Sequence, residues 1–146
     1  MLTEKDYCDY DTCVALKELG YKEKCVAYYD TEDNVGLLYN TQWASYGECY
    51  QYFDVLESHN TSTEYYIDAP TLWDAQKWLR EEKGIYVMIE ILWKTDDGLG
   101  WCYICCNKPL TEEDQEVCFA SGGFFDSYEE ALLEGIKEAI KILKEE

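Results

Sequence analysis

Residues 85–106 read IYVMIEILWKTDDGLGWCYICC, and this stretch decides the fold. In its first ten residues alternate side chains point to opposite faces, as they do in an extended strand. One of these faces is entirely apolar and consists of Ile85, Val87, Ile89, Ile91 and Trp93. The dipeptide Asp97-Gly98 is a hairpin-turn signal, and Trp101–Cys106 would return as the partner strand. The stretch therefore predicts an antiparallel β-hairpin.

Helical patterns lie on both sides of this hairpin. We expect a helix from Pro70 to Gly84, where Thr71 and Asp74 approximate a capping box. After the hairpin, Ser127-Tyr128-Glu129-Glu130 is a full capping box. It precedes an apolar stripe made of Tyr128, Ala131, Leu132, Gly135, Ile136, Ala139, Ile140 and Leu143. A shorter helix is expected from Asp9 to Leu19, ending at Gly20.

The remaining strands are short. We expect one at Cys25–Tyr29, one at Val117–Ala120, and two or three tyrosine-rich strands between Leu37 and Tyr66. Three helices with a mainly antiparallel sheet indicate an α+β fold. At 146 residues the chain has the length of one domain, so residues 1–146 are expected to form a single compact domain.

Acidic and aromatic residues dominate the segment between Cys25 and Gln76. It contains nine carboxylates and eleven aromatic side chains but no lysine or arginine, in a chain of formal charge -19. Carboxylates repel phosphates, so direct nucleic-acid binding is disfavoured, and so is an anionic membrane surface. A basic protein surface is the partner that this charge favours.

No apolar run approaches the roughly 18 residues that span a bilayer, and residues 1–6 lack the features of a secretory signal. We therefore expect a cytoplasmic protein. In that compartment the eight cysteines are expected to be thiols. Cys102 and Cys105 would point to opposite faces of a strand, which argues against a shared zinc ion. We expect no metal and no cofactor.

Catalytic signatures are weak. His59 is the only histidine, and no cysteine is placed beside it by the sequence. The adjacent carboxylates Asp96 and Asp97 are explained by the hairpin turn. We therefore expect no catalytic residues and no enzymatic activity, although an enzyme of unrecognised type stays a third alternative.

Three stretches of the chain resemble a known group of proteins. They are Leu16–Tyr21 followed by Cys25–Tyr29, then Ala69–Leu72 with Ala75, Trp78–Arg80 and Lys83–Ile85, and finally Phe125 with Ser127–Leu132. The chain resembles small uncharacterised proteins carried by phages and prophages of gut bacteria. This resemblance implies a bacterial host cytoplasm and no known activity.

Two function hypotheses follow from these features. In the first, an acidic, tyrosine-rich face binds a basic host protein, as an accessory or anti-defence factor that imitates nucleic-acid charge. Its expected contact residues are Glu48, Tyr50, Tyr52, Asp54, Glu57, Tyr65 and Tyr66. In the alternative, a pocket binds a small anionic ligand such as a nucleotide, through Trp78, Arg80 and Lys83. The oligomeric state is not predicted.

Overall fold

The computed structural model describes residues 2–32, 36–39, 41–43, 50–52, 58–94, 98–106, 118–120 and 123–145. The chain divides into two compact units. We call residues 1–6 and 72–146 the hairpin unit and residues 7–71 the tyrosine unit. The expectation of one domain for residues 1–146 stays a prediction, and each unit is described by itself.

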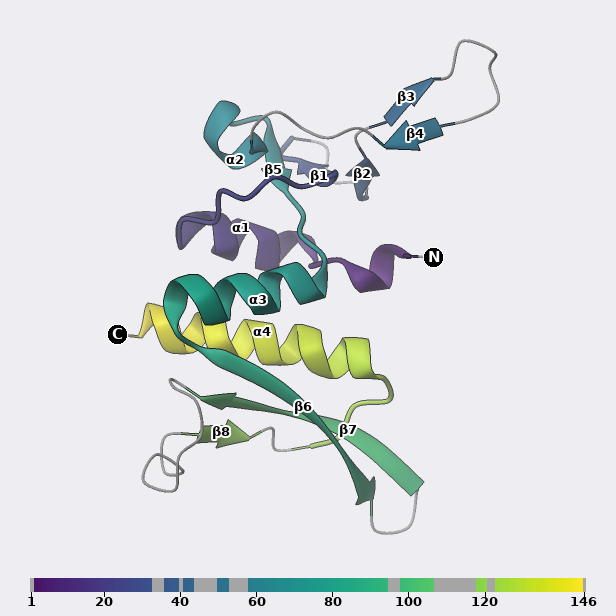
Figure 1. The fold of residues 1–146 in the computed structure, drawn as a ribbon, viewed down its shortest axis with the longest axis vertical. Coiled ribbons are helices and arrows are strands. Elements are labelled where there is room, and N and C mark those ends of the chain that lie inside the picture. Colours follow the sequence, from purple (N-terminus) through teal and green to yellow (C-terminus); the bar gives the residue numbers. More distant parts are fainter. Residues whose placement is uncertain are drawn as a thin grey trace. The chain divides into compact units, whose positions relative to one another are not determined.

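The hairpin unit is built on the stretch that the alternation pattern identified. Strand β6 (Tyr86–Lys94) pairs with β7 (Gly98–Cys106) in an antiparallel register from Tyr86↔Cys106 to Lys94↔Gly98. β7 also pairs with β8 (Cys118–Ala120), which gives the order β6-β7-β8 (Figure 1). The unit also contains a short 3-10 helix, η1 (Glu4–Asp6), and the helices α3 (Leu72–Lys83) and α4 (Tyr128–Lys144). The predicted hairpin is confirmed.

Helix α4 packs against the sheet through its apolar stripe. Leu132, Ile136 and Ala139 are fully buried, as the periodicity predicted, and Ile142 is buried beyond the predicted set. The closest approach is at Gly135, where a Cβ atom would lie 2.6 Å from Cγ1 of Val87 and 3.0 Å from Cβ of Tyr103. Glycine is therefore required here by the separation of helix and sheet rather than by its backbone angles.

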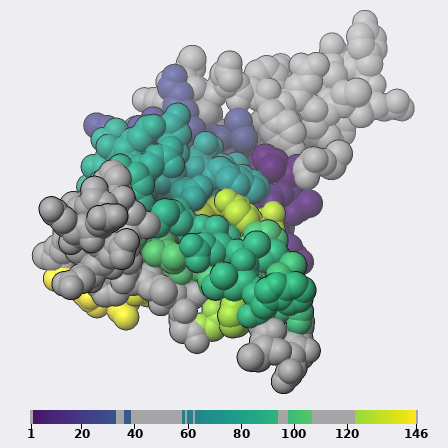
Figure 2. Space-filling model, turned by 60° about the horizontal axis from the view of Figure 1, so that its bottom comes forward, coloured from purple at the N-terminus to yellow at the C-terminus, as the bar shows by residue number. Residues whose placement is uncertain are grey.

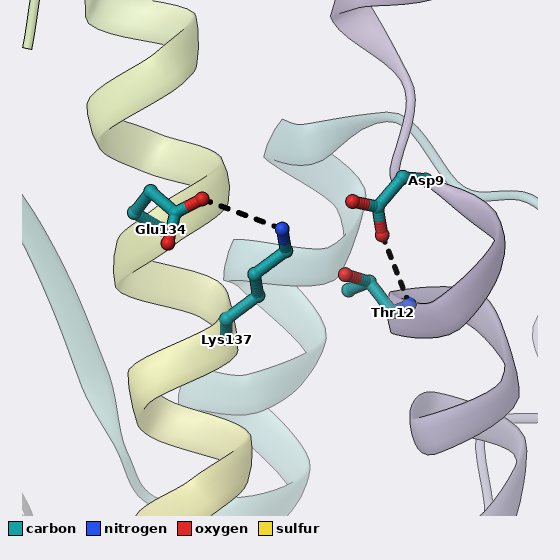
Figure 3. A network of polar contacts seen from close by, with 4 residues as sticks. All are labelled: Asp9, Thr12, Glu134 and Lys137. Carbon is teal, nitrogen blue, oxygen red and sulfur yellow. Dashed lines mark hydrogen bonds and ion pairs between the residues drawn. The ribbon is translucent and has the colours of Figure 1, made fainter.

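The start of α4 differs slightly from the predicted capping box. Oγ of Ser127 accepts the backbone N–H of Glu130 at 3.1 Å, as expected for an N-cap. The carboxylate of Glu130, however, accepts the backbone N–H of Asp126 at 3.3 Å instead of that of the N-cap residue. One turn further on, Lys137 donates to Glu134 at 3.3 Å on the helix surface (Figure 3).

The tyrosine unit is made of much shorter elements. In chain order these are α1 (Tyr10–Glu18), β1 (Ala27–Asp30), β2 (Leu38–Tyr39), β3 (Thr41–Trp43), β4 (Tyr50–Tyr52), α2 (His59–Ser62) and β5 (Tyr66–Asp68). They form one sheet of order β2-β1-β5 and a second sheet of β3 and β4 (Figure 1). All pairings are antiparallel.

Both ends of α1 follow from local sequence. Oδ1 of Asp9 accepts the backbone N–H of Thr12 at 3.0 Å, so Asp9 is the N-cap, a position for which the sequence offers both Asp9 and Asp11 (Figure 3). At the other end Gly20 has φ 99°, and N–H bonds run from Gly20 to Lys17 O and from Tyr21 to Leu16 O. This pattern is a Schellman motif, which ends the helix at the predicted glycine.

The described elements confirm an α+β fold with antiparallel sheets and three longer helices, to which the structure adds the four-residue α2. None of the helices within the described ranges has the length and apolar character that a membrane span requires.

Candidate functional site: the Tyr65 face

An accessible pocket lies in the tyrosine unit around Tyr65. Its volume is about 510 Å³, and it is lined by Lys17, Asn60, Thr61, Thr63, Glu64 and Tyr65. The Tyr65 side chain is 58% exposed, and the neighbouring Glu64 is also exposed. The turn after α2 holds these residues, because Thr31 Oγ1 donates to the carbonyls of Glu64 and Tyr65 at 3.2 and 3.1 Å. We call Glu64, Tyr65 and the pocket lining the Tyr65 face.

Beneath the surface, a cluster of hydrogen-bonded polar groups holds the residues of the Tyr65 face in place. Asn60 joins three segments: Nδ2 donates to Tyr21 O at 2.9 Å, and Oδ1 accepts the N–H of Asp68 at 3.0 Å. Oδ2 of Asp68 accepts from the Asn60 N–H at 3.1 Å and from the Ser58 hydroxyl. These bonds hold α2 against β5 and so fix the position of Asn60 in the pocket lining.

One carboxylate of the acidic segment lies inside this cluster. Asp68 is only 1% exposed, so its carboxylate orders the fold and does not face a partner. Its Oδ1 atom has no hydrogen-bond partner within the described part of the chain. Burying an incompletely paired carboxylate is costly, which identifies Asp68 as a sensitive point of the unit.

Other tyrosines of this unit are held by ring contacts. Tyr28 and Tyr66 meet edge to face with ring centroids 4.9 Å apart, and Tyr10 meets Tyr29 at 5.7 Å. The Tyr29 hydroxyl donates to Cys8 O at 3.1 Å. Burial, followed by the proximity of Tyr66 and Asp30, raises the pKa of Tyr28. Tyr66 is therefore half-buried and engaged, whereas Tyr65 is the more exposed of the two predicted contact residues.

Several predicted contact residues cannot be placed. Glu48, Asp54 and Glu57 lie outside the described residues. Tyr50 and Tyr52 belong to β4, of which the structure describes the backbone alone. For these five residues the binding role stays a prediction.

The residues predicted for a small anionic ligand lie on α3, in the hairpin unit. Trp78 is buried, and Nζ of Lys83 lies 5.5 Å from the centroid of its ring. Arg80 is exposed, two positions after Trp78. Positions i and i+2 do not share a helix face, so Arg80 and Trp78 point in different directions. Lys83 contributes a cation–π contact with a core residue, and the ligand role of the three stays a prediction.

The cysteines show one correction. Cys8, Cys13, Cys25, Cys102 and Cys105 are buried thiols. Cys106, however, is disulfide-bonded, so the expectation of thiols was wrong at this position. Strand alternation predicts which face a cysteine takes but not whether another cysteine lies close enough to form a disulfide. Cys102 and Cys105 lie on opposite faces of β7, as predicted from their spacing.

Burial makes the thiols of Cys105 and Cys13 poor nucleophiles. It raises the pKa of Cys105 to about 12, with a smaller contribution from Glu138, and the Cys105 thiol donates to Gly135 O at 3.3 Å. Burial also raises the pKa of Cys13, helped by its neighbour Cys8. The reactive form of cysteine is the thiolate, which these environments suppress. Among the described residues no group of three histidine, cysteine or acidic side chains is placed to hold a metal ion.

One exposed surface was missed by the sequence reasoning. At the turn end of the hairpin, Trp93 is 77% exposed, Leu99 52% and Ile91 44%, and Leu92 is exposed as well. Ile91 and Trp93 belong to the apolar face of the strand and are exposed, although α4 reaches Trp101, opposite Ile91, through Tyr128 with ring centroids 5.6 Å apart. The length of β6 could have indicated this exposed surface. Its nine residues span about 30 Å, which is longer than the contact that one crossing helix makes.

Comparisons with protein-family models, with curated proteins and with solved structures found no match for this chain.

Proposed function

We propose that this protein is a non-enzymatic binding protein whose acidic, tyrosine-rich surface engages a basic surface of another protein. The observation that carries the proposal is the Tyr65 face. An aromatic ring that is 58% exposed stands beside an exposed carboxylate, on a turn anchored by hydrogen bonds. Tyrosine gives a large contact area with few rotatable bonds, which is why it is enriched at binding interfaces.

Electrostatics favours a basic partner. The formal charge of -19 attracts a basic surface over a Debye length of about 8 Å at physiological ionic strength. The acids would act chiefly on the association rate, and the central ring chiefly on the dissociation rate. Glu48, Tyr50, Tyr52, Asp54 and Glu57, from the same acidic segment, complete the proposed surface.

The biological setting that we propose rests on the resemblance to phage and prophage proteins. In that setting the protein acts in the cytoplasm of a bacterial host as an accessory or anti-defence factor. Its carboxylates would take the place of nucleic-acid phosphates on a basic host protein.

A capture experiment with matched charge changes tests this proposal. The wild type and three variants serve as baits in bacterial lysate at low and high salt: Tyr65→Ala, Glu64→Lys, and the triple change Glu48→Lys, Asp54→Lys and Glu57→Lys. The control is Glu82→Lys, at an exposed position of α3. We expect a partner that the wild type and the control retain, that the triple variant loses, and that dissociates faster from Tyr65→Ala. Equal capture by all folded variants would contradict the proposal.

A second candidate function is supported by the chemistry of the pocket itself. Lys17, Asn60, Thr61, Thr63, Glu64 and Tyr65 line an open pocket of about 510 Å³, within the size range of small-ligand sites, and Lys17 is the cation among them. Tyr65 offers a ring for stacking. We propose a small anionic ligand such as a nucleotide as the alternative occupant. Calorimetric titration with ATP tests it: binding by the wild type that Lys17→Glu abolishes and Glu82→Lys retains supports the alternative, and no heat with the wild type contradicts it.

A further inference from the structure

Strand β6 forms an edge of the sheet in the hairpin unit. The strand order is β6-β7-β8, so β6 is paired on one side only, and within the described ranges no strand pairs with its other side. The edge strand is nine residues long and strongly apolar. A long apolar edge offers a row of unpaired N–H and C=O groups to any extended chain, and most proteins protect such edges.

The open part of the edge is identified by hydrogen bonds. Nε2 of Gln76, on α3, donates to Val87 O at 2.7 Å, so the backbone polar groups of Val87 face away from β7. Along an antiparallel strand the backbone N–H and C=O groups of every second residue point to the same side. Those of Ile89, Ile91 and Trp93 therefore point away from β7, like those of Val87. A bridge on the far side of β7 agrees with this register, because Trp101, opposite Ile91, exchanges hydrogen bonds of 3.1 and 2.7 Å with Phe125. Gln76 therefore covers the edge at Val87, and among the described residues no hydrogen-bonding partner covers it from residue 89 to residue 93.

Side-chain exposure coincides with this open edge. Ile91 and Trp93 are exposed on one face of the strand, and Leu92 is exposed on the other. Part of the green surface in Figure 2 comes from β6 and β7. Native edge strands are usually protected by inward charges, proline or a bulge. Residues 89, 91 and 93 supply none of these.

We propose that the β6 edge at residues 89–93 binds an extended segment of another protein, with alternating apolar and basic residues, as an additional strand. Strand addition uses main-chain hydrogen bonds for affinity and alternate side chains for specificity. The incoming apolar side chains would lie beside Ile89, Ile91 and Trp93. An incoming lysine or arginine would lie beside Glu90, which is exposed on the opposite face.

Charge complementarity selects this occupant. A second copy of the chain would bring together two molecules of formal charge -19, and an anionic membrane would be repelled in the same way. A basic segment, in contrast, is attracted to the acidic chain within about one Debye length. This site lies in the hairpin unit and does not depend on the Tyr65 face, so each proposal can fail alone.

Hydrogen exchange of the full-length protein with synthetic peptides tests the proposal. The probe is a nine-residue peptide of alternating valine and lysine, and the matched control peptide carries glutamate in place of lysine. We expect the lysine peptide to slow exchange at the amides of Ile89, Ile91 and Trp93 by about tenfold or more at saturation. Amides that pair within the hairpin, such as that of Leu92, should change little. Unchanged exchange at the three outward amides, or equal protection by the glutamate peptide, would overturn the proposal.

A proline substitution separates main-chain pairing from hydrophobic contact. Ile91→Pro removes an outward N–H and leaves the β6–β7 hydrogen bonds in place, a position where edge strands tolerate proline. Ile91→Ala is the matched control, since it removes the side chain and keeps the donor. We expect Ile91→Pro to lose peptide binding and Ile91→Ala to weaken it less. If Ile91→Pro does not fold, the hydrogen-exchange measurement on the wild type still tests the proposal.

Other occupants would appear as distinct results. Concentration-dependent protection of the same amides in the protein alone would identify a second copy and overturn the proposal. A shift of Trp93 fluorescence with phosphatidylcholine vesicles, without any response to the lysine peptide, would identify a lipid surface and overturn it as well. Protection by the lysine peptide that Glu90→Lys abolishes would support it most directly.

Discussion

The two units use different means to hold their folds. The hairpin unit has two nine-residue strands and a seventeen-residue helix, and its contacts are mainly apolar burial along a stripe. In the tyrosine unit no described strand exceeds four residues. Its segments are joined by side chains that bond distant backbone groups, such as Asn60 to Tyr21 and Tyr29 to Cys8. A long amphipathic helix or strand buries a large apolar surface, whereas short elements depend on individual polar contacts.

This difference determines which substitutions should destabilise each unit. Apolar burial is spread over many side chains, so the hairpin unit should be damaged chiefly by a charge or by a change of volume at the helix–sheet contact. A polar cluster fails when one acceptor is removed, because its donors are left buried and unpaired. The following predictions are ordered from the largest expected effect to the smallest.

Leu132→Asp should have the largest effect. Leu132 is fully buried on α4, so aspartate there would be an unpaired buried charge, costing above about 4 kcal/mol of unfolding free energy. Denaturant unfolding with hydrogen exchange resolves the effect by unit. The control is Leu133→Asp, one position further and only half-buried, which should be milder. Equal loss of exchange protection in both units would show that they unfold as one and would weaken the contrast between them.

Asp68→Ala is the corresponding test of the tyrosine unit. It removes the acceptor of the Ser58 hydroxyl and one of the two acceptors of the Asn60 N–H, and we expect a loss of about 2–4 kcal/mol. Asp68→Asn keeps one carbonyl oxygen as an acceptor and should cost clearly less. Thermal unfolding of both variants provides the measurement. A similarly small loss for both would show that the cluster does not hold this unit together.

Gly135→Ala tests the contact between helix and sheet. The new methyl group would meet Cγ1 of Val87 at 2.6 Å, and overpacking of this kind costs about 1–3 kcal/mol. Alanine favours a helix over glycine by about 1 kcal/mol, so the net loss should be smaller. Combining Gly135→Ala with Val87→Ala removes the closer of the two approaches and leaves the one to Tyr103, and a thermodynamic cycle should then show a favourable coupling. A stabilised single variant would contradict the close approach.

Alkaline pH should weaken the hairpin unit through Cys105. Burial raises the pKa of its thiol from 9.0 to about 12, so the unfolded chain loses this proton first as the pH rises. The stabilisation is complete below pH 9 and is lost between pH 9 and 12, by about 1 kcal/mol at pH 10. Urea unfolding at pH 8 and pH 10 measures the loss. Cys105→Ala should lose less over this interval, and an identical loss would refute the assignment.

The two N-caps offer the smallest and most closely matched comparison. Asp9→Ala removes an acceptor 3.0 Å from the Thr12 N–H, and Ser127→Ala removes one 3.1 Å from the Glu130 N–H. Each should cost about 0.5–1 kcal/mol in thermal unfolding. Because α1 has nine residues and α4 has seventeen, the loss should be a larger share of local stability at α1. A larger loss of exchange protection in α4 would reverse this expectation.

The sequence by itself determined the elements whose signals are local. The β6–β7 hairpin, the helices α1, α3 and α4, the N-cap Ser127 and the helix-ending Gly20 all follow from alternation, periodicity or capping within a few residues. For α1 the sequence offered Asp9 and Asp11, and the structure selects Asp9 as the N-cap. It also determined the acidic, tyrosine-rich composition on which the proposed function rests. These features need no distant contact, because each is encoded within one strand or one helical turn.

The tertiary structure alone decided which of these residues are available. It buried Asp68 under Asn60 and Ser58, left Tyr65 exposed beside a pocket, and bonded Cys106 in a disulfide. It also left Ile91 and Trp93, from the apolar face of β6, exposed at the turn end of the hairpin. Exposure and pairing depend on which segments meet across long sequence separations, and no local pattern carries that information.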